Sequence, residues 1–336
     1  MAEEIRIGLV GMGGIMGRHV KDLADVPEAN VVALVDPVPA NRTRYKAGHA
    51  GLADAAEYDD YQAMLDAEDL SGVVIASPHT VHYEQNMAAL ERGIHVLCEK
   101  PMVCRIDHAI DIVRKVRETG LVLGLAYQRH YGGEYRYVRQ AIADGRIGKL
   151  QTVQCFQCQG WKEGTKGSWR QDPALSGGGQ LNDSGSHLVD IMLWMTGLAA
   201  ETVSAQIDHC GTPVDINSAL SIRFTSGAVG TLTVVGDYPG PGMYEDISIM
   251  GTEGGFHIRQ GQLMIQLTGR KGPVLTVDTS RLGGGSMSRN FIRAIQRAEK
   301  PAAPAECGLR VIELTEAAWK SAKQNGAPVT VPRTDL

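Results

Sequence analysis

The sequence lacks any apolar run that approaches the roughly 18 residues a helix needs to cross a bilayer. It also lacks the positively charged start of a signal peptide, because "MAEEIRIGLVGMGG" places two glutamates ahead of its first apolar stretch. Basic residues are not in excess, and a formal net charge of −5 gives no sign of a general attraction to nucleic acid or anionic membrane. We therefore expect a cytoplasmic protein that binds neither nucleic acid nor membrane.

Cysteine is scarce, with six among 336 residues, and in a chain without an export signal we expect the thiols to be reduced. Cys155 and Cys158 form a C-x-x-C pair, which could suggest zinc or redox chemistry. Their context, "LQTVQCFQCQG", is typical of a strand, on which residues three apart point to opposite faces. The sequence holds no second C-x-x-C to complete a four-ligand zinc site, so we expect no metal.

Repeats and low-complexity linkers are also absent, and the length exceeds that of one ordinary core, which indicates two domains. Residues 1–126 alternate short apolar runs with helical stretches, a pattern typical of βαβ units and a doubly wound parallel sheet. Residues 127–336 begin with a helix, continue in strand-like runs separated by turns, and end in two amphipathic helices. The predicted class is α/β, with a large open, mostly antiparallel sheet in the second domain.

A glycine-rich turn directly follows the first strand in "IRIGLVGMGGIMGRHV". Gly11, Gly13 and Gly14 would let the backbone approach a pyrophosphate, and the following helix would supply N–H groups and a positive dipole. The spacing departs from G-x-G-x-x-G because Met16 occupies the third glycine position. The position between a first strand and a first helix favours a dinucleotide site over a plain strand–helix turn.

Asp36 ends the second strand in "VVALVDP". A carboxylate there can accept hydrogen bonds from the adenosine ribose and would repel a 2′-phosphate, which favours NAD over NADP. Arg42 and Arg44 follow closely and keep NADP open as the less favoured cofactor.

A lysine lies at the carboxyl end of a buried strand in "GIHVLCEKPM". Ligands bind outside such strand ends in open α/β sheets, and Pro101 biases Lys100 toward an extended backbone. The ammonium of Lys100 could then stabilise negative charge on a substrate oxygen. The alternative is an exposed lysine paired with Glu99.

Polar residues interrupt an apolar helical segment in "GGGQLNDSGSHLVDIMLWMTG". Asp183, His187 and Asp190 are spaced i, i+4 and i+7 and would share one helix face. Polar groups on so apolar a helix need partners, so the stripe is a candidate catalytic site. The alternative makes Asp183 the helix N-cap and His187 a satisfied core histidine.

These motifs together resemble the glucose–fructose oxidoreductase, inositol dehydrogenase and rhizopine-catabolism (Gfo/Idh/MocA) family. The similarity runs from "VGMGGIMGRH" through "CEKPM", "GRIGKLQTV" and "WRQDPALSGGGQLNDSGSHLVDIMLWMTG" to "GLRVIELTEAAWKSA", essentially the whole chain. It implies a Rossmann domain, a second domain whose open sheet forms a homodimer or homotetramer contact, and NAD(P)-dependent oxidation or reduction of a sugar or cyclitol carbinol. The family's catalytic lysine, aspartate and histidine correspond to Lys100, Asp183 and His187.

The resemblance also implies two sets of binding residues, with His130 and Asn182 departing from the usual family pattern. The expected cofactor-binding residues are Gly11, Gly13, Gly14, Ile15, Met16, Asp36, Ser77, Pro78, His79, His82, Glu99, Lys100 and Gln128. The expected substrate-binding residues are Lys100, His130, Trp161, Trp169, Arg170, Asn182, Asp183 and His187.

The predicted chemistry is hydride transfer, in which His187 removes the hydroxyl proton as hydride leaves the same carbon. Asp183 would orient His187 or hold a neighbouring hydroxyl, and Lys100 would bind the reacting oxygen. A redox-neutral alternative uses the same residues for transient oxidation of a sugar, followed by elimination of a glycosidic substituent. A third hypothesis is a cofactor-binding regulator without enzymatic activity.

Overall fold

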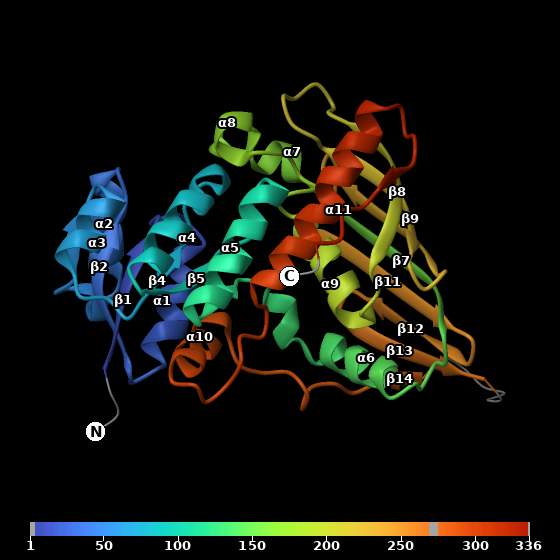
Figure 1. Ribbon diagram of the computed structural model, residues 1–336, viewed down its shortest axis with the longest axis horizontal. Coiled ribbons are helices and arrows are strands. Elements are labelled where there is room, and N and C mark those ends of the chain that lie inside the picture. The colour runs from blue at the N-terminus through green and yellow to red at the C-terminus, as the bar shows by residue number, and fades with distance from the viewer. Residues whose placement is uncertain (1–3, 269–274, 335–336) are drawn as a thin grey trace. The chain divides into compact units, whose positions relative to one another are not determined.

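The computed structural model describes residues 4–268 and 275–334, which form two compact units (Figure 1). Among the described residues, the first unit runs through Gln128 and also contains Gly285–Leu309, and the second contains Arg129–Gly284 and residues 310–334. The prediction of one boundary after residue 126 therefore differs from the structure in the position of residues 285–309. These residues return to the first unit because helix α10 (Met287–Ile295) packs there, with the Phe291 ring against the backbone of Gly72.

The first unit is built on a six-stranded parallel sheet in the order β3-β2-β1-β4-β5-β6, which confirms the doubly wound prediction. The strands are β1 (Ile5–Val10), β2 (Ala29–Val35), β3 (Ala56–Tyr58), β4 (Gly72–Ile75), β5 (His95–Cys98) and β6 (Leu123–Leu125). The helices are α1 (Met16–Ala24), α2 (Pro39–Gly48), α3 (Tyr61–Ala67), α4 (His82–Glu91), α5 (Ile106–Thr119) and α10, with short turns η1 (Ala50–Leu52) and η2 (His79–Val81). β4 is buried at every position, as expected for a central strand covered on both faces.

The second unit is built on a nine-stranded sheet in the order β14-β13-β12-β11-β7-β10-β9-β8-β15. β7 and β10 pair in parallel and the other pairs are antiparallel, which confirms the predicted mostly antiparallel sheet. The strands are β7 (Leu150–Gln159), β8 (Ala200–Asp208), β9 (Asn217–Phe224), β10 (Val229–Val235), β11 (Met243–Gly251), β12 (Gly254–Arg259), β13 (Gln262–Leu267), β14 (Leu275–Val277) and β15 (Val329–Thr330). The helical elements are η3 (Gln128–Tyr131), α6 (Gly133–Ala143), α7 (Trp161–Gly164), η4 (Trp169–Gln171), α8 (Pro173–Ser176), α9 (Gly185–Thr196) and the part of α11 (Ala305–Lys323) from Arg310 on.

Helices lie on one face of the second sheet, and α9 packs on the central strands β7 and β10 (Figure 1). β9 alternates buried and exposed residues almost without interruption, the pattern of a strand with one packed and one open face. Cys155 and Cys158 both lie on β7 as free thiols, on opposite faces by strand alternation. Burial raises the pKa of the Cys155 thiol, which opposes redox reactivity at this position.

The structure corrects the predicted helix face shared by Asp183 and His187. The helix after the glycine loop begins at Gly185, with Ser184 at its N-cap position. Asp183 therefore precedes α9 and neither caps it nor shares its helical face with His187. The short strands β3, β14 and β15 were not anticipated, because two or three residues carry too little periodicity.

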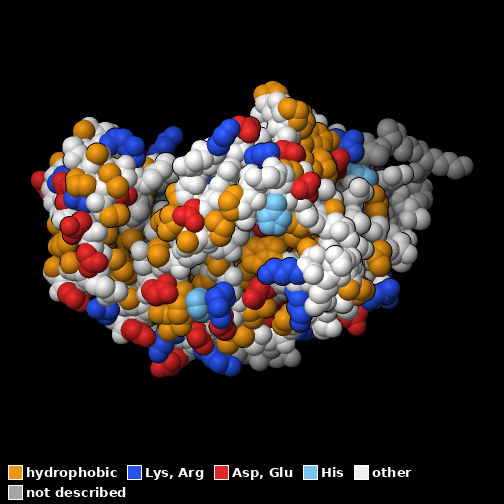
Figure 2. All heavy atoms as spheres, turned by 90° about the horizontal axis from the view of Figure 1, so that it is seen from above, with side chains coloured by type: hydrophobic (Ala, Val, Ile, Leu, Met, Phe, Trp, Pro, Cys, Tyr) orange, Lys and Arg blue, Asp and Glu red, His pale blue; other side chains and the backbone are white. Residues whose placement is uncertain are grey.

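Among the described residues, no helix combines the length and the apolar character that a membrane span requires. Acidic and basic side chains are interspersed over the face shown in Figure 2.

Candidate active site

The turn between β1 and α1 has one glycine that the fold requires and two that it does not. Gly11 has φ +83°, and a Cβ there would lie 2.7 Å from the backbone of Ala76 and Ser77. Gly13 and Gly14 are exposed, and a Cβ on either would meet nothing within 4 Å. The space above the turn is thus left open by the protein itself, as a bound pyrophosphate would need.

The start of α1 has no side-chain cap. Ile15 at the N-cap position makes no capping hydrogen bond, and the first turn carries no acidic residue. Ile15 is 41% exposed, whereas Met16 is fully buried in the core. The first N–H groups and the positive end of the helix dipole therefore meet the open space above the glycine turn, an arrangement that suits an anion.

Helix α2 holds the same turn from its other side. The Tyr45 hydroxyl donates to the Gly13 carbonyl over 2.5 Å, and Arg44 Nη2 donates to the Met12 carbonyl over 2.9 Å. Because these two carbonyls are bound, the conformation of the turn is fixed from the side of α2.

Asp36 is buried at the end of β2 and is already a hydrogen-bond acceptor. Its Oδ2 accepts from Met12 N over 2.8 Å, and its Oδ1 accepts from Val38 N over 2.8 Å and from Asn41 over 3.1 Å. A carboxylate has about four lone-pair sites, so room remains for a ribose hydroxyl. The buried Arg42 pairs with Glu57 over 3.3 Å, which leaves it poorly placed for a 2′-phosphate.

The residues after β4 are held by buried histidines. His82 is fully buried, with Nδ1 2.8 Å from the Pro101 carbonyl and Nε2 3.0 Å from the Ser77 carbonyl. Burial lowers its pKa, against the opposing effect of the two carbonyls. His82 thus ties the loop after β4 to the loop after β5, and His79 packs beside it with a centroid distance of 5.9 Å.

Lys100 lies directly after β5, half-buried, as expected for the end of a parallel strand. Its backbone N–H donates to Glu99 Oε2 over 3.2 Å. Glu99 is buried and its Oε1 lies 3.0 Å from His19 Nε2. The Glu99 carboxylate therefore points into the unit. Pro78 follows β4 and Gln128 follows β6, the two strands beside β5.

In the second unit, two predicted substrate residues, Trp161 and Arg170, donate to the carboxylate of a third, Asp183. Asp183 Oδ2 accepts from Trp161 Nε1 over 2.9 Å and from Arg170 Nε over 3.0 Å. The Arg170 guanidinium in turn stacks over the Trp169 ring, 4.5 Å from its centroid. Asp183 is buried while Arg170 is partly exposed. The four residues form one charged and aromatic cluster immediately before α9.

The glycine loop before Asp183 is shaped by two residues that the sequence did not single out. A Cβ on Gly178 would lie 2.6 Å from the Trp319 ring, and one on Gly179 would lie 2.0 Å from the Asp215 carbonyl oxygen. The buried Asp215 carboxylate accepts from Gly179 N (2.9 Å), Leu181 N (2.7 Å) and Trp319 Nε1 (3.2 Å). Consecutive glycines are needed here so that the loop can lie against this anchor.

The start of α9 is fixed to the sheet, and His187 lies half-buried in its first turn. Gln157 of β7 donates to the Ser184 hydroxyl over 2.8 Å and accepts from Arg129 Nη2 over 3.3 Å. Arg129 also pairs with Glu245 of β11. This buried network ties the helix that carries His187 to two strands.

His130 and Asn182 are both buried in the second unit. His130 is 1% exposed, its Nε2 lies 2.7 Å from Asp190 Oδ2, and its ring packs on Trp194 at 4.2 Å. Burial raises the pKa of the Asp190 carboxyl, although His130 opposes this shift. Asn182 has no exposed surface.

Lys100 belongs to the first unit, whereas Asp183 and His187 belong to the second. Sequence reasoning missed His19, Asp215 and Trp319, because their partners are distant in the chain. The glycine run at 177–179 was the one local signal that another segment approaches closely there.

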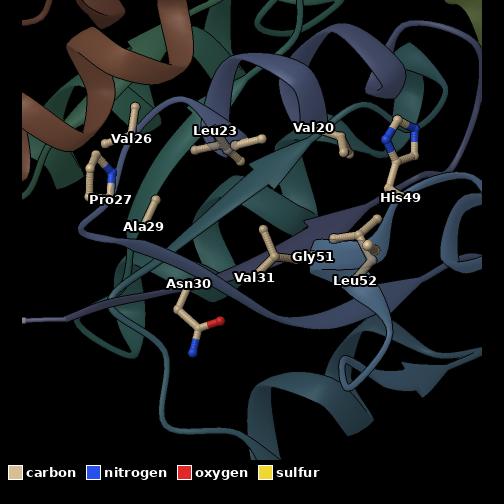
Figure 3. A pocket seen from close by; sticks show the side chains of 12 residues that line it. Val20, Leu23, Val26, Pro27, Ala29, Asn30, Val31, His49, Gly51 and Leu52 are labelled. Atoms are coloured by element: carbon tan, nitrogen blue, oxygen red, sulfur yellow. The ribbon is translucent and has the colours of Figure 1, made fainter.

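A separate cavity of about 400 Å³ lies in the first unit, next to the amino-terminal end of β2 (Figure 3). Its wall is mainly apolar side chains of α1 and β2, with Asn30 and His49 as polar members. Because ligands of such sheets bind at the carboxyl ends of the strands, this cavity is not part of the candidate site.

Comparisons with known proteins agree over both units. A model described as "Oxidoreductase family, NAD-binding Rossmann fold" matches residues 5–127, and one described as "GFO/IDH/MocA C-terminal domain" matches residues 135–257. Levoglucosan dehydrogenase of Pseudarthrobacter phenanthrenivorans is 27% identical over 289 residues, 75% of this chain and 73% of that protein. Inositol 2-dehydrogenase of Streptomyces avermitilis is 31% identical over 207 residues, 60% of this chain and 57% of that protein.

The fold is also that of a solved dehydrogenase. The structure of levoglucosan dehydrogenase in complex with NADH and levoglucosan matches with a TM-score of 0.88 at 22% sequence identity, over 98% of this chain and 100% of that one. At this identity the likeness shows the fold alone. The alignment with inositol 2-dehydrogenase spans little more than half of that protein's length.

Proposed function

Because the chain belongs to the Gfo/Idh/MocA oxidoreductase family and carries its NAD-binding Rossmann domain, we propose that it transfers hydride between NAD and a secondary carbinol of a sugar or cyclitol. The names of the relatives support this substrate class, since levoglucosan is an anhydrosugar and inositol a cyclitol. The observation that carries the proposal is a buried carboxylate that is held in place close in sequence to a histidine. Asp183 is held by two nitrogen donors, four residues before the half-buried His187.

The first unit supplies the cofactor site in this proposal. Gly13, Gly14 and the uncapped start of α1 would hold the pyrophosphate. Asp36 would accept from the adenosine ribose through its remaining lone pairs and would repel a 2′-phosphate, so NAD is preferred to NADP. His82 and Glu99 support the neighbouring strand ends from inside the unit rather than contacting the cofactor with their buried polar atoms.

Bound NAD supplies the hydride acceptor. His187 takes the proton of the substrate hydroxyl, a role that suits an imidazole because its ordinary pKa lies close to neutrality. The Lys100 ammonium donates to the same oxygen and stabilises the negative charge that develops on it. Asp183, fixed by Trp161 and Arg170, orients the histidine or holds a neighbouring hydroxyl. Trp169 and Arg170 offer a stacking surface and a donor for a polyhydroxylated ring.

The test is a screen of cyclitols, aldoses and glycosides with NAD and with NADP, followed by the absorbance of the reduced nicotinamide. We expect turnover with at least one polyol and NAD, and a loss of about 100-fold or more in kcat for His187→Ala and for Lys100→Ala. NAD affinity should remain in His187→Ala. The matched controls are a histidine and a lysine outside the candidate site, His257 on β12 and Lys115 on α5. His257→Ala and Lys115→Ala should keep the wild-type kcat.

Wild-type kcat in His187→Ala across the pH range would remove the histidine from the mechanism. If NAD copurifies with the protein and the protein cleaves a glycoside without releasing NADH, the redox-neutral reaction replaces the dehydrogenase reaction. NAD binding without turnover of any tested polyol or glycoside would favour a regulator.

The proposal includes a homodimer or homotetramer through the open face of the second sheet. A shallow hollow of about 250 Å³ on this sheet is lined by Gln154, Phe156, Tyr244, Asp246, Ser248 and Arg259. The Phe156 and Tyr244 rings pack edge to face across β7 and β11, with their centroids 6.2 Å apart. Aromatic residues on an uncovered sheet face are typical of protein interfaces.

A further inference from the structure

A buried polar cluster lies beneath the strand end that carries Lys100. His19 of α1 is completely buried, and its two ring nitrogens contact two different elements. Nε2 lies 3.0 Å from Glu99 Oε1, and Nδ1 lies 3.0 Å from the hydroxyl of Ser288 in α10. Ser288 is also completely buried, and Glu99 is 7% exposed. Three segments separated by 80 or more residues therefore meet at one imidazole.

Both oxygens of the Glu99 carboxylate are engaged. Oε1 faces His19, and Oε2 accepts from the backbone N–H of Lys100 over 3.2 Å. Burial of a carboxylate is costly unless it is paired and hydrogen-bonded, so removal of His19 would leave Glu99 without its buried partner. The side chain would then turn toward solvent or toward Lys100, and its bond to the Lys100 backbone would be lost.

The hydroxyl of Ser288 fits either form of the imidazole. It can donate to Nδ1 when His19 is neutral and accept from Nδ1 when His19 is protonated. The ring is thus held in one orientation with Nε2 toward Glu99 in both forms. Stability alone does not explain the buried hydrogen bonds of His19 with Glu99 and Ser288. Apolar residues of similar volume can often replace a buried polar pair without loss of stability.

We propose that His19 is a positioning residue for Lys100, which it fixes through the Glu99 carboxylate, with Ser288 holding the imidazole. This inference rests on the proposed function only for the role of Lys100 in hydride transfer. It assigns the Glu99 carboxylate to the support of the lysine instead of to the cofactor.

The test is a double-mutant cycle between His19→Ala and Glu99→Gln, read at saturating NAD and substrate. Each variant should lower kcat about 10-fold, and the double variant should lower it little further, because residues that act as one unit are non-additive. The Kd for NAD should change less than about 3-fold, since neither side chain contacts the cofactor in this assignment. His19→Gln should recover part of kcat, because an amide N–H can replace Nε2–H toward Glu99.

The matched control is His95→Ala, at the opposite end of the same strand. His95 Nδ1 accepts from Val122 N over 2.9 Å, so its removal weakens β5 without touching the Lys100 end. A loss of kcat in His95→Ala equal to that in His19→Ala would reduce the effect to strand stability and overturn the proposal. Additive losses in the double-mutant cycle would overturn it too.

A second measurement does not depend on any activity. Hydrogen exchange of the Lys100 amide should accelerate about 10-fold in His19→Ala and in Glu99→Ala, and not in His95→Ala, because this amide loses its acceptor only in the first two. Unchanged exchange in His19→Ala would overturn the inference even where the dehydrogenase proposal stands. If the wild type oxidises no polyol, the exchange result still decides whether His19 positions Lys100.

Discussion

Gly11 and Gly13 lie two residues apart in the same turn, yet a methyl group has different consequences at each. At Gly11 both the backbone angle and the neighbouring backbone of Ala76 exclude a side chain. At Gly13 nothing in the chain excludes one. Gly11 is thus required by the fold, whereas Gly13 leaves space for a ligand bound above the turn.

We expect Gly11→Ala to lower the free energy of unfolding by about 2 kcal/mol or more, because it combines a positive φ with a backbone clash. Gly13→Ala should leave stability within about 0.5 kcal/mol of the wild type but weaken NAD binding about 10-fold or more. Thermal unfolding and fluorescence titration with NADH measure the two effects. Equal NAD affinity in Gly13→Ala and wild type would remove the turn from the cofactor site.

The Glu99 carboxyl gives a pH-dependent prediction at the same scale. Burial alone would raise its pKa, but the hydrogen bond and charge of His19, together with Lys100, hold the pKa below the ordinary value of 4.5. A depressed folded-state pKa contributes stability that is complete above about pH 4.5 and is lost as the pH falls through the folded value. The wild type should therefore exceed Glu99→Gln in Tm above pH 5, and the difference should shrink between pH 4.5 and 3.

The measurement is Tm from pH 7 to pH 3 for both proteins, with Glu118→Gln as the control for an exposed glutamate that is 68% accessible. A Tm difference between wild type and Glu99→Gln that stays constant down to pH 3 would contradict the assignment.

At the scale of elements, the position of α9 depends on the loop that leads into it. Asp215 lies between β8 and β9 and accepts from backbone N–H groups of the loop at residues 177–181. Trp319 of α11 donates to Asp215 and lies against Gly178 of the same loop. Burial raises the pKa of the Asp215 carboxyl, against three N–H donors that favour the charged form. The loop geometry is thus set by a residue remote from the catalytic candidates in sequence.

We expect Asp215→Ala to destabilise the protein by about 2–4 kcal/mol, because three buried N–H groups lose one acceptor. Hydrogen exchange at Gly179 and Leu181 should become faster, and kcat should fall more than NAD affinity. Asp208→Ala is the control, since the carboxylate of the exposed Asp208 accepts from Cys210 N at the end of β8. Wild-type exchange at both amides in Asp215→Ala would show that the loop does not need this anchor.

At the scale of the whole molecule, the second sheet has nine strands, and within the part of the chain that the structure describes its helices cover one face (Figure 1). Its strands present alternating residues to the other face, including Phe156 and Tyr244. An uncovered sheet face of this kind is expected to be buried against a second copy.

Phe156→Glu should shift the protein toward monomer, because a charge at the centre of a buried interface is strongly unfavourable. The molar mass from size-exclusion chromatography with light scattering measures this shift. Leu175→Glu on α8, where the leucine is 38% exposed, is the matched control and should keep the wild-type mass. A monomeric wild type, or an unchanged mass in Phe156→Glu, would refute the interface.

Local sequence patterns predict the two sheets, most of their strands and the glycine turn, because periodicity and turn residues act over short stretches of chain. Sequence motifs that include Lys100, Asp183 and His187 also identify the family. Only the tertiary structure decided that residues 285–309 return to the first unit, that α9 starts after Asp183, and that Trp161 and Arg170 bind this aspartate. It alone brought His19 to Glu99 and Asp215 to the glycine loop, since such contacts depend on packing between segments far apart in the chain.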